Sequence, residues 1–188
     1  MQINDIYCGP AVLEMLMGFN GIKIDQEAIV KAAGNADKIK IRGTLPEEIG
    51  IAVKNISPAM QFWYKRFATL KELSTLVNYF HQPAGIEWQG VFEDEEGEDG
   101  GDDDPGHYSI VTKIDTHKNI VMIADPYKHY ARKDRRFSIL EFERRWWDIN
   151  EVVDPVTKHK SEMYDYHLMF TVAPEFVTFP AELKMIRG

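Results

Sequence analysis

The sequence predicts an α+β fold, and two observations support this prediction. The first half of the chain carries apolar residues at helical spacing between clear start and stop signals, whereas the second half carries β-rich runs joined by a short turn. Helices first and antiparallel strands later is the order typical of the α+β class. No internal repeat is visible, and 188 residues suit one compact domain, so we expect a single domain over residues 1–188.

The first half should form four helices, each with a recognisable start. Proline in the first turn of the first helix costs nothing, because its missing N–H would have no partner there. Side-chain caps are expected from Asp25, Thr44 and Thr69, with Glu47 at the capping-box position after Thr44. The expected helices run from Cys8 to about Gly18, from Asp25 to Ala33, from Thr44 to about Lys54 and from Thr69 to Phe80.

The second half should form strands with one more helix. Residues 107–114 and 119–124 are rich in β-branched side chains, and the four residues between them are short enough for a hairpin. Ser138 is the expected cap of an amphipathic helix that runs through Trp147. The remaining expected strands are a short one over residues 86–88 and a last one over residues 166–172.

One segment carries most of the charge. The formal net charge is −8, but nine acidic residues and no basic one lie between Glu93 and Asp104, so the rest of the chain sums to −8 + 9 = +1. A nucleic-acid binder should show a clustered basic excess, and the short run Arg132–Arg136 is interpreted as solvated surface. We expect residues 93–105 to form a mobile, solvated loop, because they lack the regular ligand order of a calcium-binding EF-hand.

The chain should be a soluble protein with a free thiol. No apolar run approaches the roughly 20 residues of a membrane helix, and the first residues do not resemble a secretory signal, so a cytoplasmic location is expected. Cys8 is the only cysteine, which excludes an internal disulfide and a zinc site built on several cysteines. Cys8 is therefore a buried structural thiol or a reactive one.

Four residues could form a reactive site around that thiol. Free amides and the helix dipole at the start of a helix would stabilise a thiolate at Cys8. His107 opens a strand directly after Pro105-Gly106, and Asp125 ends the next strand of the same hairpin, so the two can come within hydrogen-bond range. Gln2 lies six residues before Cys8, close enough to direct its amide at the same centre.

This set of motifs resembles the papain-like cysteine peptidases, and most closely the bacteriocin-processing (double-glycine) peptidases of family thirty-nine with their free-standing relatives. The resemblance rests on Gln2 followed by Cys8-Gly9, on Gly106-His107, and on Asp125-Pro126, in that order, and it extends from about Gln2 to Pro174. It implies a papain-like fold, with N-terminal helices packed on a C-terminal antiparallel sheet.

The same resemblance implies a role for each residue. Cys8 would be the nucleophile, His107 the general base and then acid, and Asp125 the group that orients the imidazole. Gln2 would donate to the oxyanion together with the backbone N–H of Cys8. The Cys-His-Asp arrangement needs no cofactor or metal, and we expect none.

The expected function is a hydrolase, a thiol peptidase acting on a peptide or protein through an acyl-enzyme on Cys8. The acidic loop precedes His107, and carboxylates attract cationic substrates. A preference for basic peptides is therefore a hypothesis. Two alternatives stay open. The same site could pass the acyl group to an amine or thiol, as in the related phytochelatin synthases, or the domain could bind peptides without catalysis.

Overall fold

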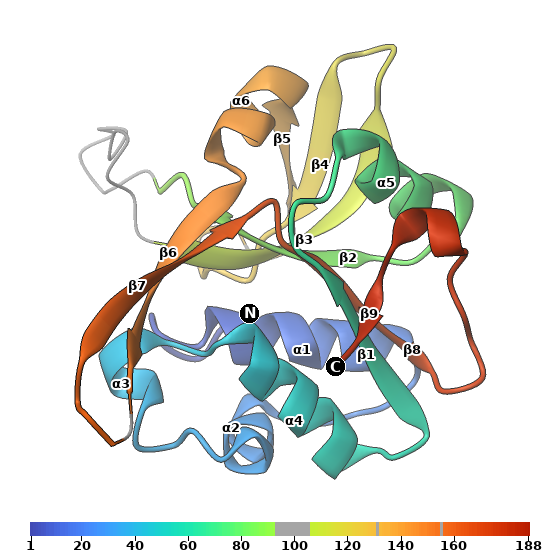
Figure 1. Ribbon diagram of the computed structural model, residues 1–188. Helices are drawn as coiled ribbons and strands as arrows, with labels where there is room; N and C mark the ends of the chain where they lie inside the picture. Colours follow the sequence, from blue (N-terminus) through green and yellow to red (C-terminus); the bar gives the residue numbers. More distant parts are fainter. Residues whose placement is uncertain (93–105, 131, 155) are drawn as a thin grey trace.

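The computed structural model describes residues 1–92, 106–130, 132–154 and 156–188, so the predicted acidic loop lies outside the described residues. Its main element is an antiparallel sheet of seven strands in the order β5-β4-β3-β2-β8-β1-β9, which lies between two layers of helices (Figure 1). A separate ribbon pairs β6 with β7. The predicted α+β class, with helices packed on an antiparallel sheet, is confirmed.

The bounds of these elements are as follows. The helices are α1 (Cys8–Phe19), α2 (Gln26–Ala33), α3 (Ile39–Arg42), α4 (Pro46–Ile56), α5 (Leu70–Ser74) and α6 (Ile139–Arg145). The strands are β1 (Met60–Lys65), β2 (Ala84–Gln89), β3 (Gly106–Asp115), β4 (Ile120–Ala124), β5 (Asp134–Ser138), β6 (Trp147–Val153), β7 (Lys160–Tyr166), β8 (Met169–Pro174) and β9 (Ile186–Arg187). Within the described residues, no helix is both long and apolar enough to cross a membrane.

Helix α2 follows the sequence prediction because both of its ends carry strong local signals. The Asp25 side chain accepts a hydrogen bond from the Ala28 N–H at 2.7 Å, which satisfies one of the free donors of the first turn. Gly34 ends the helix with φ 68°, a left-handed conformation that glycine adopts without steric cost.

The predicted start of the next long helix is wrong by one position. Helix α4 begins at Pro46, whose ring fixes the backbone angle that the first helical residue needs, so Leu45 rather than Thr44 is the N-cap. Glu48, not Glu47, folds back and accepts the Leu45 N–H at 3.0 Å. Thr44 is instead buried, and its hydroxyl accepts a hydrogen bond from Asn35 at 3.3 Å.

The predicted helix over residues 70–80 is only half α-helical. Thr69 caps it as expected, but α5 ends at Ser74 and a π-helical turn, Thr75–Tyr79, follows. In that turn Asn78 donates to the Ile114 carbonyl at 2.7 Å and accepts from the Ile114 N–H at 3.2 Å. The two hydrogen bonds fasten the turn to the end of β3.

The predictions for the second half are correct for the strands β2, β3 and β4 and wrong at the end of α6 and in the last strand. Strands β2, β3 and β4 lie where expected, and Asp115 accepts the Lys118 N–H at 3.0 Å in the turn between β3 and β4. Helix α6 stops at Arg145, and Trp147 begins β6 instead of ending the helix. The expected strand over residues 166–172 is divided, since residue 166 ends β7 and β8 begins at Met169.

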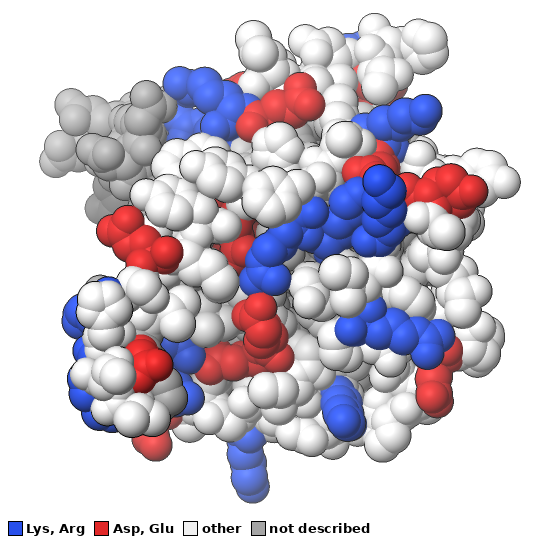
Figure 2. All heavy atoms as spheres, in the orientation of Figure 1, with Lys and Arg blue, Asp and Glu red and all other residues white. Residues whose placement is uncertain are grey.

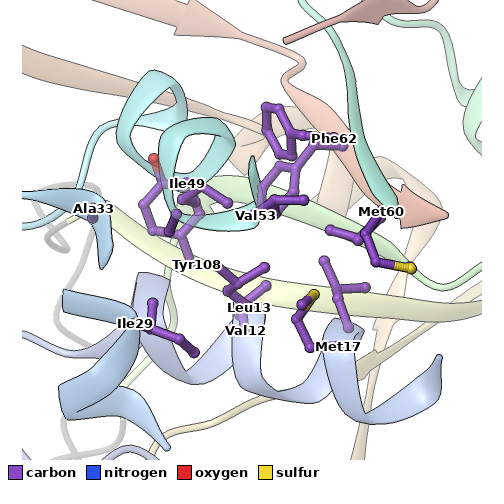
Figure 3. Packing of buried hydrophobic residues seen from close by; sticks show 14 of the residues in the cluster. Val12, Leu13, Met17, Ile29, Ala33, Ile49, Val53, Met60, Phe62 and Tyr108 are labelled. Atoms are coloured by element: carbon purple, nitrogen blue, oxygen red, sulfur yellow. The ribbon is translucent and has the colours of Figure 1, made fainter. Parts of the chain in front are cut away.

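Apolar residues pack on both faces of the seven-stranded sheet. On one face, Leu13 from α1 and Val53 from α4 meet Phe62 from β1, and Tyr108 of β3 lies at the edge of the same cluster (Figure 3). On the other face, Phe142 and Trp146, at α6, cover β2, β3 and β4. Burial of these faces fixes α1 against β3, and so fixes the start of α1 relative to the start of β3.

Candidate active site

Cys8 is the first residue of α1, and its half-buried side chain lies next to the start of β3. Burial raises the pKa of the thiol, but a hydrogen bond and charge from His107, together with the backbone N–H groups of Tyr108 and Gly9, outweigh burial and hold the pKa below its ordinary value. A Cβ atom at Gly9 would lie 3.0 Å from the Cβ of Thr44, so the glycine lets the first turn of α1 pack closely against Thr44. Cys8 is therefore set up to exist as a thiolate.

His107 connects the thiol to a carboxylate. Its ring is 4% exposed, and Nε2 lies 2.8 Å from Oδ1 of Asp125, which leaves Nδ1 for the hydrogen bond to Cys8. Burial alone would lower the pKa of the imidazole, but the hydrogen bonds and charges of Asp125 and Cys8 raise it to about 9. The ring is therefore held as an imidazolium at neutral pH.

Asp125 is buried and bound by three donors. Oδ1 accepts from His107 and from the backbone N–H of Tyr127 at 2.9 Å, and Oδ2 accepts from Nη1 of Arg135 at 2.8 Å. Burial raises the pKa of this carboxyl, but the bonds from His107, Tyr127 and Arg135 outweigh burial and hold the pKa below its usual range. Asp125 stays ionised beside the imidazole.

Gln2 is held next to this group by its backbone. It is 5% exposed, and its N–H donates to the carbonyl of Pro126, the residue after Asp125, at 2.8 Å. Gln26 clamps the same segment, since its Oε1 accepts the Ile3 N–H at 3.0 Å and its Nε2 donates to the Met1 carbonyl at 2.9 Å. The structure thus brings Cys8, His107 and Asp125 together, and it fixes the backbone of Gln2 to the residue that follows Asp125.

Sequence reasoning missed Arg135, Gln26 and Phe92 around this site. Arg135 belongs to the run that was interpreted as solvated surface, and a run of charges gives no indication of which side chain points inward. The signal that could have found it is alternation: with residues 134–138 read as a strand, Arg135 falls on the same face as the buried Phe137.

A second buried polar group lies behind the start of β3. Glu87, Asp148 and Asp165 come from three strands, and Asn150 donates to Glu87 at 3.2 Å and to Asp165 at 3.1 Å. Arg66 forms an ion pair with Asp165. Burial and the neighbouring carboxylates raise the pKa of Glu87 well above its ordinary value.

Gly106, the residue before His107, is closely packed against this polar group. A Cβ atom at Gly106 would overlap the carboxylate of Asp148, which accepts a hydrogen bond from Gln89 at 2.9 Å. The absence of a side chain at position 106 therefore lets β6 approach the start of β3. Among the residues that the structure describes, this group included, no three His, Cys, Asp or Glu side chains are arranged to hold a metal ion.

Comparison with known proteins identifies the family. The sequence profile of the Peptidase C39-like family matches residues 1–154, which include all four candidate residues. Six solved chains are similar in fold; one is the peptidase domain of Streptococcus ComA, a bifunctional ABC transporter involved in a quorum-sensing pathway. That domain superimposes with a TM-score of 0.57 at 20% sequence identity, over 93% of this chain and 96% of the other. No curated protein matches the chain significantly. The chain therefore belongs to the Peptidase C39-like family, with the fold of a C39 peptidase domain.

Proposed function

We propose that the protein is a cysteine peptidase that cleaves a peptide bond through an acyl-enzyme on Cys8. The observation that carries this proposal is the hydrogen-bonded chain from the Cys8 thiol through His107 to Asp125, with Nε2 of His107 2.8 Å from the carboxylate. A lowered thiol pKa and a raised imidazole pKa are the combination that a thiolate nucleophile and a proton donor require.

In this proposal the Cys8 thiolate attacks the carbonyl carbon of the substrate, and the carbonyl π-electron pair moves to the oxygen. The resulting oxyanion accepts hydrogen bonds from the Cys8 N–H and the Gln2 side-chain amide. When the C–N bond breaks, His107 gives its proton to the leaving amine. His107 then takes a proton from water as the water attacks the thioester, and the acid product leaves with Cys8 restored.

Two residues support this chemistry without taking part in bond breaking. Asp125 stabilises the imidazolium and fixes which nitrogen faces the thiol. Gln26 holds the segment that carries Gln2, so an amide near the chain terminus can act from a fixed position. We infer that the substrate is a peptide or protein, with basic residues favoured by the acidic residues 93–104 that precede His107. A reducing compartment such as the cytoplasm would keep the thiol free.

The test is the rate of alkylation of Cys8 by iodoacetamide across pH, in the wild type and in His107→Ala. Cys8 is the only thiol, so every alkylation event reports on it. We expect fast alkylation that persists to about pH 6 in the wild type and is lost in His107→Ala, because the imidazolium stabilises the thiolate.

The matched control is His117→Ala, which removes an exposed histidine from the turn after β3 and should leave the profile unchanged. A wild-type midpoint near 8.5, the value of an ordinary thiol, with no response to His107→Ala would overturn the proposed function. If alkylation gives the expected result, cleavage of a peptide library by the wild type but not by Cys8→Ala would identify the substrate class.

A further inference from the structure

Arg135 extends from β5 to two different parts of the candidate site. Its Nη1 donates to Oδ2 of Asp125 at 2.8 Å, and its Nη2 donates to the backbone carbonyl of Val91 at 2.6 Å. One guanidinium therefore joins the end of β4 to the segment that follows β2, two regions 34 residues apart in sequence at their contact points.

The guanidinium is enclosed as well as bonded. The Arg135 side chain is 12% exposed. Its Cζ atom lies 3.7 Å from the centre of the Tyr130 ring and 4.9 Å from the centre of the Phe137 ring. Stacking on aromatic faces fixes the plane of the fork, and a planar fork can hold two acceptors at once. Neighbouring Arg136 is exposed, so enclosure belongs to residue 135 and not to the whole basic run.

The segment held by Arg135 carries a side chain that packs on His107. Phe92, next to Val91, lies with its ring centre 5.0 Å from that of His107 at an interplanar angle of 77°, and 5.0 Å from the ring of Tyr127. The T-shaped contact packs the Phe92 ring against the imidazole. Asp125 and the segment that carries Phe92, two of the neighbours of His107, are thus both bonded to one arginine.

We propose that Arg135 is a positioning residue for the reaction of Cys8, which fixes the Asp125 carboxylate toward His107 and holds Phe92 against the imidazole. This inference rests on the proposed function. The bond from Arg135 to the Asp125 carboxylate should affect the pKa values of Asp125, His107 and Cys8. The bond from Arg135 to the Val91 carbonyl should fix how the Phe92 ring packs on His107.

The charge balance gives the direction of the effect. The titratable groups around the guanidinium are Asp125, His107 beyond it, Cys8 at the far end, and Tyr130 stacked on the fork. Removing one enclosed positive charge makes Asp125, His107 and Cys8 bind protons more readily. The thiolate of Cys8 would then form only at higher pH.

The experiment is the pH profile of Cys8 alkylation in Arg135→Gln, Arg135→Lys and Arg136→Gln, alongside the wild type and His107→Ala. We expect Arg135→Gln to move the acid limb upward by about one pH unit, a tenfold slower alkylation on that limb, and Arg136→Gln to match the wild type. Arg135→Lys keeps the charge but not the fork, so its limb should stay near the wild type.

The packing role has its own readout in the NMR spectrum. Phe92 forms a T-shaped contact with His107, and in Arg135→Lys we expect the shifts of the His107 ring protons to move toward those of a free imidazole, because a single ammonium nitrogen lacks the planar fork whose two nitrogens hold the Asp125 carboxylate and the Val91 carbonyl. Should Arg135→Gln fail to fold by circular dichroism, Arg135→Lys still decides, since unchanged His107 shifts would overturn the fork assignment.

The two proposals fail in different ways. If His107→Ala changes the profile and Arg135→Gln does not, Arg135 is not a positioning residue and the proposed function stands. If the wild type alkylates as an ordinary thiol whatever stands at position 107, both proposals are overturned.

Discussion

At the scale of single residues, the protonation of His107 is the property on which the site depends. A pKa of about 9 keeps the imidazole charged throughout the neutral range, so in the proposed reaction the proton for a leaving amine would be present before substrate binds. Turnover should therefore be lost as the pH rises through about 9, where the acid is consumed, and on the acid side where Cys8 takes up a proton.

Replacing Asp125 with asparagine should lower the pKa of His107. An amide has no charge to stabilise the imidazolium, and removal of an opposite charge at hydrogen-bond distance shifts a pKa by about one to three units. The measurement is an NMR titration of the His107 ring in the variant. Asp134→Asn, which alters an exposed aspartate on β5, is the control. Equal His107 titration in Asp125→Asn and the wild type would contradict the role given to the carboxylate.

Cys8, His107 and Asp125 could be predicted to lie together because each stands at a local signal: a helix start, a strand start and a strand end. Gln2 stands at no such signal and was proposed from its spacing before Cys8 and from the family resemblance.

Arg135 and Gln26 could not be predicted, since their importance comes from contacts across the fold. Arg135 reaches Val91 over 44 positions and Gln26 reaches Ile3 over 23. Sequence alone does not encode which of several polar side chains turns inward at such a distance.

At the scale of elements, β6 packs against the start of β3, where Asp148 lies against Gly106, the residue before His107. We expect Gly106→Ala to destabilise the protein by about 1 to 3 kcal/mol, the usual effect of forcing a methyl group into a packed site. In an Asp148→Ala background the same change should have a much smaller effect, because the overlapping carboxylate is gone. Urea unfolding of the four proteins measures the coupling between the two positions.

The unfolding free energies of the same four proteins can also contradict this prediction. If the two changes are additive to within about 0.5 kcal/mol, Asp148 is not the reason that position 106 lacks a side chain. Gly90→Ala is not a suitable control, since a Cβ atom there would meet Phe92. Gly18→Ala is suitable, because a Cβ atom at Gly18 meets nothing within 4 Å.

Elements with local signals were predictable, and elements fixed by partners were not. Helix α2 has a cap at each end and was predicted to the residue. Strand β1 carries no flanking turn signal comparable to that of the central hairpin, and it is a strand because β8 pairs with all six of its residues. The ribbon of β6 and β7 was missed for the same reason, since each strand is defined by the other.

At the scale of the whole molecule, the formal charges outside the acidic segment nearly cancel, since −8 + 9 = +1. Figure 2 shows basic and acidic side chains interspersed on one face. The absence of nucleic-acid binding stays a prediction that rests on composition. One buried acid should make the stability of the fold depend on pH: burial raises the pKa of Asp148 to about 6, because it disfavours the charged carboxylate.

The stability of the fold should consequently fall as the pH rises through the range from about 4 to about 6. An acid whose pKa is higher in the folded protein than in the unfolded chain binds more protons when folded, so its contribution is complete below the unfolded pKa near 3.9 and is lost by the folded pKa. We expect this loss to reach about 2 to 3 kcal/mol relative to Asp148→Asn.

Unfolding by urea at several pH values, in the wild type and in Asp148→Asn, measures this loss. Glu48 and Asp125 act in the opposite direction, but their pKa values are lowered, so their contributions disappear only at more acidic pH. Parallel stability curves for the two proteins between pH 4 and 6 would show that Asp148 does not titrate in this range.

The close fit of Gly106 to Asp148 has a consequence for evolution and for design. Positions 106 and 148 constrain each other, so natural relatives with a side chain at the first position should carry a smaller residue than aspartate at the second. In the Gly106-His107 pair, the glycine is then explained by the packing of β6, and only the histidine by the proposed reaction. When His107 and its hairpin are transplanted into another scaffold without β6, Asp148 no longer restricts position 106, and a residue other than glycine can be used there.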